Sequence, residues 1–71
     1  MQRLAKIDRI IGEIVEILKK DNRGLTIQEL ANLTKTSRIT VSMALMKLDG
    51  AEIIEVRTIG NCKLHYLMAK K

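Results

Sequence analysis

The chain has 71 residues, of which 46% are hydrophobic and 30% are charged. That length suits one small domain with a modest core, and the apolar fraction is too high for an intrinsically disordered segment. Thirteen Lys and Arg residues against eight Asp and Glu residues give a formal net charge of +5, which favours an anionic partner such as nucleic acid.

Tyr66 is the only aromatic residue and Cys62 is the only cysteine. Proteins that bind single strands stack bases on several aromatic rings, so duplex DNA is a better candidate partner than a single strand. One cysteine cannot form an intramolecular disulfide, and we find neither a signal peptide nor an apolar run long enough to cross a membrane. We therefore expect a reduced, cytoplasmic protein that does not bind membranes.

The first predicted helix spans about residues 3–20. Its apolar residues recur at spacings of three and four, as one buried helical face requires, and they are Leu4, Ile7, Ile11, Ile14 and Leu18. Lys19 and Lys20 suit the negative end of the helix dipole, and Gly24 permits a left-handed exit.

Additional apolar residues, Ile10, Val15 and Ile17, widen this face to an arc of about 160°, against the roughly 100° that docking one face needs. Ile10 and Ile17 lie seven residues apart along one edge of the helix. This edge is either the interface of a homodimer or part of a broad core face.

The second predicted helix spans about residues 27–33, and the third about residues 38–48. Thr26 and Glu29 have the spacing of a capping box at the start of the second helix. Ser37 is the expected cap of the third helix, and Asp49-Gly50 is its expected end. The apolar residues of the third helix fall on one face: Val41, Ala44, Leu45 and Leu48. Two such helices joined by about four residues form a helix-turn-helix outline.

Residues 53–68 are predicted to form a β-hairpin. Two β-branched, partly alternating segments flank Ile59-Gly60-Asn61, which has the residues of a tight reversal. A two-stranded hairpin is marginal alone and must pack on the helices. We therefore expect a mainly α fold with a β-hairpin, in the α+β class.

The spacing of helix-contact residues is the most specific feature of the chain, and it comprises Leu30-Ala31, Ser37, Thr40-Val41-Ser42, Ala44-Leu45, Leu48 and Gly50. The hairpin follows, with Ile53-Ile54 at its start and Leu64-His65-Tyr66-Leu67 on its return. Over residues 1–71 this pattern resembles the three-helix winged helix-turn-helix DNA-binding domains of bacterial and archaeal transcription regulators, in which such a hairpin is the wing.

The resemblance implies a transcription regulator that binds duplex DNA, with the third helix in the major groove and the wing on the backbone or minor groove. The residues implied as DNA contacts are Gln28, Lys35, Ser37, Arg38, Thr40, Ser42, Lys47, Arg57 and Lys63. Arg38 could pair with guanine edges or a phosphate. Ser37 is expected first as a helix cap, and an exposed cation on a small basic domain is often only part of its solvated surface.

The sequence departs from the family's pattern at Met43, where such helices often carry a basic residue. Met43 joins Ile39 and Met46 on the predicted outer face of the third helix. These side chains either contact thymine methyl groups or dock a protein partner, unless the helix is rotated from the predicted orientation. Docking would make the chain a protein–protein interaction module, and structured RNA is a third, weaker candidate partner.

The turn between the second and third helices also departs from the family. Lys35 stands where the family often has glycine, and Thr36 stands where an apolar residue is common. A left-handed Lys costs about 1 kcal/mol, so we expect a looser turn.

Cys62 and His65 are spaced like half of a metal site, but the chain has no second Cys or His. Alternation along a strand places the two on opposite faces, and we expect His65 at the strand surface or lightly packed. No nucleophile with His and an acid at a recognisable spacing occurs, and no glycine-rich phosphate loop occurs. We therefore expect no enzyme activity, no metal and no cofactor.

Overall fold

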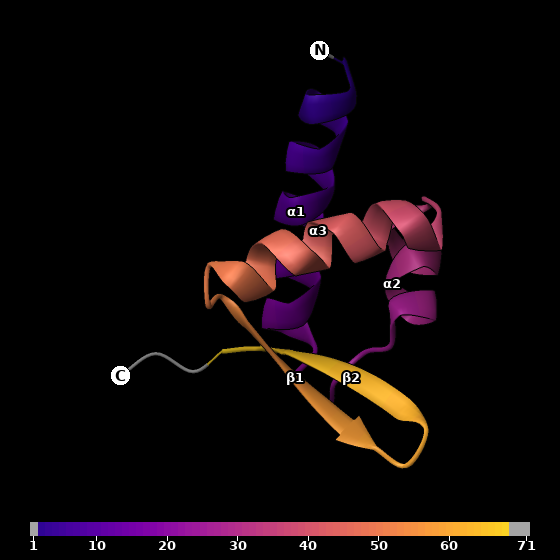
Figure 1. The fold of residues 1–71 in the computed structure, drawn as a ribbon, viewed down its shortest axis with the longest axis vertical. Helices are drawn as coiled ribbons and strands as arrows, with labels where there is room; N and C mark the ends of the chain where they lie inside the picture. The colour runs from indigo at the N-terminus through magenta and orange to yellow at the C-terminus, as the bar shows by residue number, and fades with distance from the viewer. Residues whose placement is uncertain (1, 69–71) are drawn as a thin grey trace.

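The computed structural model describes the backbone of residues 2–68 and the side chains of residues 7–68, and it shows three helices followed by an antiparallel hairpin (Figure 1). The helices are α1 (Gln2–Lys20), α2 (Ile27–Thr34) and α3 (Arg38–Gly50). The strands are β1 (Ile54–Ile59) and β2 (Cys62–Leu67). This mixed α+β arrangement confirms the predicted fold class and has a three-helix winged-helix layout.

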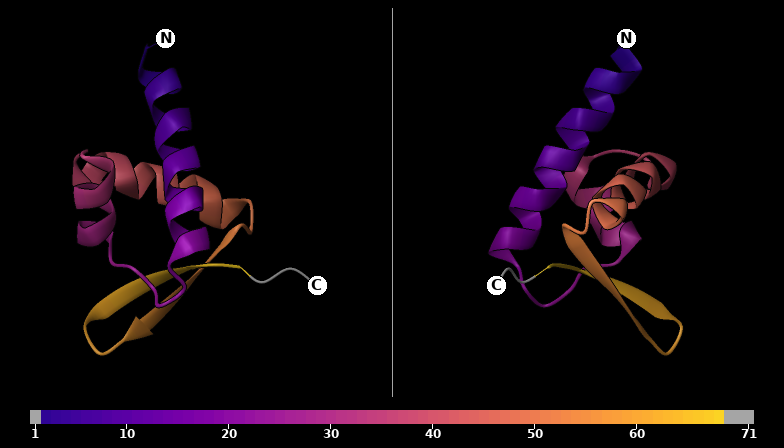
Figure 2. Two further views of the ribbon diagram at one scale, coloured as in Figure 1. Left: turned by 180° about the vertical axis from the view of Figure 1, so that it is seen from behind. Right: turned by 60° about the vertical axis from the view of Figure 1, so that its left-hand side comes forward.

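One apolar core lies between the three helices and the start of the hairpin. Its fully enclosed members include Ile14 of α1, Leu30 of α2, Val41 of α3 and Ile54 of β1. Helix α1 crosses α3, and its N-terminal part extends beyond α3 (Figures 1 and 2). The side chain of Leu4, predicted on the buried stripe of α1, lies outside the described residues.

Ile10 belongs to this core, and 0% of its surface is exposed. The prediction that Ile10 contributes to a dimer interface is therefore wrong, because packing within one chain already surrounds its side chain. Ile17 is partly buried and packs against the same core. At Ile10, the broad apolar face of α1 is therefore part of the core of a single chain.

The segment after α1 is held by an ion pair and a glycine. The Arg23 guanidinium donates to the Asp21 carboxylate at 2.9 and 3.0 Å, and the Arg23 backbone N–H donates to it at 3.1 Å. These hydrogen bonds lower the pKa of Asp21 to about 2. Gly24 has a φ of 91°, and a Cβ there would lie 2.5 Å from the ring of Tyr66. A larger residue here would be strained by this φ and would displace the Tyr66 ring.

Both helices of the helix-turn-helix end in hydrogen-bonded turns that place a non-glycine residue in the left-handed conformation. At the end of α2, Lys35 has φ 59° and ψ 43°, and Thr36 N–H donates to Ala31 at 3.0 Å. At the end of α3, Glu52 has φ 60°, and Ile53 N–H donates to Leu48 at 2.9 Å. Glycine is the usual occupant of this position because it has no Cβ.

The expectation of a looser turn at Lys35 is wrong. The chain keeps the tight geometry, and hydroxyl groups hold it. Thr34 Oγ1 donates to the Leu30 carbonyl at 2.7 Å and hydrogen-bonds Thr36 Oγ1 at 2.8 Å. These side-chain hydrogen bonds hold the turn in which Lys35 is left-handed.

The hairpin reverses at Gly60-Asn61 and pairs Ile59 with Cys62. Gly60 has a φ of 62° and Asn61 does not have a positive φ, which is the pattern of a type II′ turn and matches the twist of the strands. The register puts Val56 opposite His65 and Thr58 opposite Lys63 on one face of the hairpin. The other face carries Glu55 paired with Tyr66 and Arg57 paired with Leu64.

Two of the contacts that attach the hairpin to the rest of the fold involve Ile54 and His65. Ile54 enters the core, and Leu25 forms an isolated antiparallel bridge with His65. The two backbone bonds of this bridge are 2.9 and 3.2 Å long, and His65 Nδ1 donates to the Leu25 carbonyl at 2.8 Å. The expectation that His65 lies at the strand surface is wrong, because this bridge draws the residue against the chain segment that precedes α2.

Replacing Lys35 with glycine should raise the free energy of unfolding by about 1 kcal/mol, because glycine adopts the left-handed conformation without a Cβ clash. The urea midpoint of unfolding measures this change. Lys35→Ala is the matched control, since it removes the same charge and keeps the Cβ. Equal midpoints for the two variants would show that no backbone strain is stored at this residue.

Candidate nucleic-acid interface

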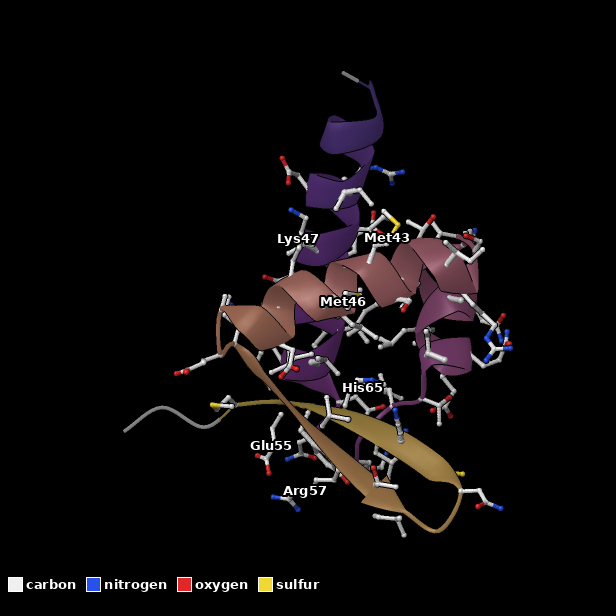
Figure 3. All side chains as sticks on the ribbon, in the orientation of Figure 1. Met43, Met46, Lys47, Glu55, Arg57 and His65 are labelled. Atoms are coloured by element: carbon white, nitrogen blue, oxygen red, sulfur yellow. The ribbon has the colours of Figure 1, made fainter. Side chains whose placement is uncertain are left out.

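The exposed surface of α3 consists of an apolar stripe between two polar edges. The stripe comprises Ile39, Met43 and Met46, which are 73%, 42% and 71% exposed. At 3.6 residues per turn, Arg38 and Ser42 lie on one side of the stripe and Lys47 lies on the other. Figure 3 places Lys47 on the edge of α3 toward α1, away from the hairpin. The predicted contacts on α3 therefore do not form one continuous polar face.

The first edge of α3 faces the hairpin across a groove of ≈ 710 Å³. Thr26, the N-cap of α2, and the first two residues of α2, Ile27 and Gln28, also line the groove. Among its lining residues are Arg38, Ser42 and Met46 of α3 and Val56, Lys63 and His65 of the hairpin. The groove thus brings together predicted contact residues from all three parts of the interface: Gln28, Arg38, Ser42 and Lys63.

Arg38 is the predicted contact that is best placed for an external ligand. It is exposed at the first position of α3, and its side chain has no hydrogen bond or ion pair to any described residue. Its backbone position is set by Ser37, whose hydroxyl accepts the Thr40 N–H at 3.1 Å and caps the helix. The guanidinium is therefore available to a ligand, while the capped helix start fixes the backbone that carries it.

The hydroxyl groups at the helix starts are engaged in capping. Ser37 Oγ donates to Thr40 Oγ1 at 3.1 Å, so the two predicted contacts bond each other. Thr26 and Glu29 form the reciprocal capping box expected from the sequence. Gln28 is exposed and donates to Asn32 at 3.2 Å. Ser37 and Thr40 have structural roles that compete with a ligand for the same hydroxyl groups.

The two predicted cations of the wing lie on opposite faces of the hairpin. Lys63 shares the face of Val56 and His65, which lines the groove. Arg57 lies on the outer face, where its Nε donates to Glu55 at 2.9 Å and its guanidinium stacks 4.9 Å from the centre of the Tyr66 ring. Glu55 raises the pKa of Arg57 through this bond. Figure 3 shows Glu55 and Arg57 pointing away from the helices.

Lys35 lies outside the groove, in the turn between α2 and α3, and its exposed side chain has no partner among the described residues. It therefore lies beside the start of α3, close in sequence to Arg38. A cation at this turn can reach a phosphate at the N-terminal end of α3.

His65 and Asp49 are two of the groove residues that the sequence analysis did not predict as contacts. No sequence signal placed His65 there, because its location depends on the bridge to Leu25. Asp49 had a signal: an acidic residue in the last turn of a helix is unfavourable beside the negative end of the helix dipole. Asp49 adds negative charge to the groove and limits how closely an anion approaches that end.

No group of three or more His, Cys, Asp or Glu side chains in the described part of the chain could hold a metal ion. Over the same residues, none of the helices is both long enough and apolar enough to cross a membrane. No protein-family model and no curated protein matches the sequence. The interface is therefore defined by the residues and geometry of this chain alone.

With a duplex DNA probe, Lys63→Ala should weaken binding and reduce the salt slope of log K by about 1, because Lys63 is a free cation beside the groove. Arg57→Ala is the matched comparison and should change the slope much less, since Glu55 already neutralises Arg57. Fluorescence anisotropy at several salt concentrations measures both slopes. A larger change for Arg57→Ala would place the DNA on the outer face of the hairpin.

Proposed function

We propose that this protein is a DNA-binding transcription regulator that acts in the cytoplasm by occupying a site on duplex DNA. Helix α3 enters the major groove, and the hairpin acts as a wing on the backbone or the minor groove. The proposal rests on Arg38, which is the first residue of the capped helix α3 and whose guanidinium has no partner among the described residues. The net charge of +5 supports it, because it favours encounter with a polyanion.

The arrangement of the groove agrees with this role. Arg38 on α3 and Lys63 on the hairpin stand on its two sides, so a DNA backbone between them meets a cation from each element. The first residues of α2, Ile27 and Gln28, also line it, and a helix N-terminus favours phosphate. Phosphate contacts of this kind fix position, while Arg38 and Ser42 can reach base edges.

A homodimer remains part of the proposal, since two half-sites one helical turn apart are the usual target of such domains. Because Ile10 is buried, Ile17 of α1 and Leu33 of α2 are the apolar residues that this side of the fold offers to a second copy of the chain. These two residues line a shallow hollow beside Gly12, with Arg9, Glu13 and Glu16 around it. Leu33 is 57% exposed, so it offers apolar surface to a second copy of the chain.

Arg38→Ala should weaken binding to the preferred duplex by about 1–3 kcal/mol and relax sequence preference, because a bidentate Arg–guanine pair contributes that much discrimination. Anisotropy titrations with a set of duplexes measure both effects. Arg9→Ala is the control, since Arg9 is an exposed arginine of α1 that pairs with Glu13. Equal weakening on every duplex would make Arg38 a phosphate contact.

A second candidate function is protein docking, and the exposure of Ile39, Met43 and Met46 favours it. Contiguous exposed apolar side chains often mark a docking surface. The same stripe can contact thymine methyl groups in the major groove. The two functions differ in how they respond to a charge placed on the stripe.

Met43→Lys should preserve or strengthen affinity for mixed-sequence duplex DNA, because it adds a cation to α3. Met43→Leu keeps the stripe apolar and serves as the control. Both are compared with the wild type by anisotropy, beside an unrelated basic protein of similar charge. Wild-type binding no tighter than that of the basic protein would reject DNA as the ligand and leave protein docking as the better hypothesis.

A further inference from the structure

The imidazole of His65 is held with one nitrogen against the fold and the other open to the groove. Nδ1 lies 2.8 Å from the Leu25 carbonyl, and since a carbonyl only accepts, Nδ1 carries a proton. No described residue hydrogen-bonds Nε2. Yet no buried side-chain nitrogen or oxygen in the described part of the chain lacks a partner. Nε2 therefore reaches solvent although His65 is only 7% exposed.

Because His65 is among the residues that line the groove, we assign this opening to the groove. In the neutral ring, Nε2 presents a lone pair there, because the proton is on Nδ1. In the charged ring, Nε2 presents an N–H donor, while the bond from Nδ1 to Leu25 is unchanged. Histidine is the side chain whose charge ordinarily changes between pH 5 and 8. One proton therefore decides whether His65 presents a hydrogen-bond acceptor or a donor to the groove.

The charged groups around this nitrogen favour an anion. Arg38 and Asp49 line the groove from α3, and Lys63 lines it from β2. The Cys62 thiol is the other titratable group there, and no charged residue of α1 or β1 is among the described residues that line it. Glu55 of β1 lies on the opposite face, and Asp21 and Arg23, ahead of Leu25, pair with each other.

The start of α2 adds neutral donors to the same groove. The first N–H groups of a helix have no partner within it. At α2, the Glu29 N–H is taken by Thr26 Oγ1 at 3.1 Å, which leaves those of Ile27 and Gln28. Both residues are among those that line the groove.

We propose that the groove holds one phosphodiester group of the DNA backbone, and that protonated His65 donates its Nε2–H to that phosphate. This inference rests on the proposed DNA binding and adds to it a residue and a pH dependence. A phosphate oxygen is repelled by the lone pair of neutral Nε2 and bound by the charged N–H. Binding therefore takes up a proton, so affinity rises as pH falls from 8 toward 5, the range in which histidine side chains ordinarily become charged.

The first test follows His65 directly, because it is the only histidine in the chain. Its ring resonances are titrated by NMR from pH 5 to 8 in wild-type protein alone, with a short duplex, and with dimethyl phosphate, a free phosphodiester of constant charge. With the duplex, the midpoint should move to higher pH by about one unit, the shift that a tenfold preference for the charged ring produces.

The outcomes of this titration separate the sources of phosphate. A shift with the duplex, with or without one from dimethyl phosphate, supports the inference. A shift with dimethyl phosphate alone would mean that the groove takes a free phosphate ester and would overturn the assignment to DNA. An unshifted midpoint when the duplex is bound would overturn the role of His65.

The second test compares duplex affinity at pH 5.5 and pH 7.5 by anisotropy at constant salt. Wild-type protein should bind about fivefold more tightly at pH 5.5, because a midpoint shift of one unit changes affinity by at most tenfold and only part of that change falls between these two pH values. His65→Asn keeps an N–H near the Leu25 carbonyl and removes the groove nitrogen. His65→Gln places a neutral donor near the position of Nε2. Both variants should bind equally at the two pH values.

Lys20→Gln is the matched control, because it removes one exposed charge from α1 at a residue that does not line the groove. It should keep the roughly fivefold ratio of affinities between the two pH values. Absence of wild-type binding at either pH would reject the proposed function itself. Wild-type binding that is equal at both pH values would reject only the role of His65, and this comparison does not depend on how the variants fold.

Discussion

The bridge between Leu25 and His65 is the constraint on which the candidate interface depends. Three hydrogen bonds join these residues, and they tie the return strand of the hairpin to the segment that leads into α2. A hairpin of two strands is marginal by itself. With Ile54 in the core at one end and this bridge farther along, the hairpin is fixed beside α3. The groove exists because of that attachment.

The same attachment decides which charges a ligand meets. Because the register places Lys63 and His65 on the helix-facing side, Arg57 falls on the outer side with Glu55 and Tyr66. An arginine already bonded to a carboxylate contributes little to an anion site, whereas an unpaired lysine contributes fully. The groove is therefore cationic at its two sides and contains Asp49 as its only described acidic residue. The apolar stripe of α3 lies next to this groove, and Met46 belongs to both.

The elements of the fold and much of the core could be predicted from residue spacing. Ile14, Val41 and Leu48 recur with helical period and are buried, and Gly60 marks the turn of the hairpin. Helix α3 ends at Gly50, as Asp49-Gly50 predicted, but Glu52 and not this glycine takes the left-handed position. Lys35 likewise adopts a conformation that its residue type disfavours. In both turns, hydrogen bonds closed by the following residue outweigh local preference.

The sequence by itself determined the order of elements, the capping box at Thr26 and the apolar exposed face of α3, because each depends on residues within one or two helical turns. Only the tertiary structure decided that Ile10 is enclosed, that Arg57 and Lys63 face opposite ways, and that His65 opens on a groove. These three depend on contacts between residues far apart in the chain, such as the 40 positions that separate Leu25 from His65. Periodicity reports which side of an element is apolar, whereas the packing of elements against each other decides what that side meets.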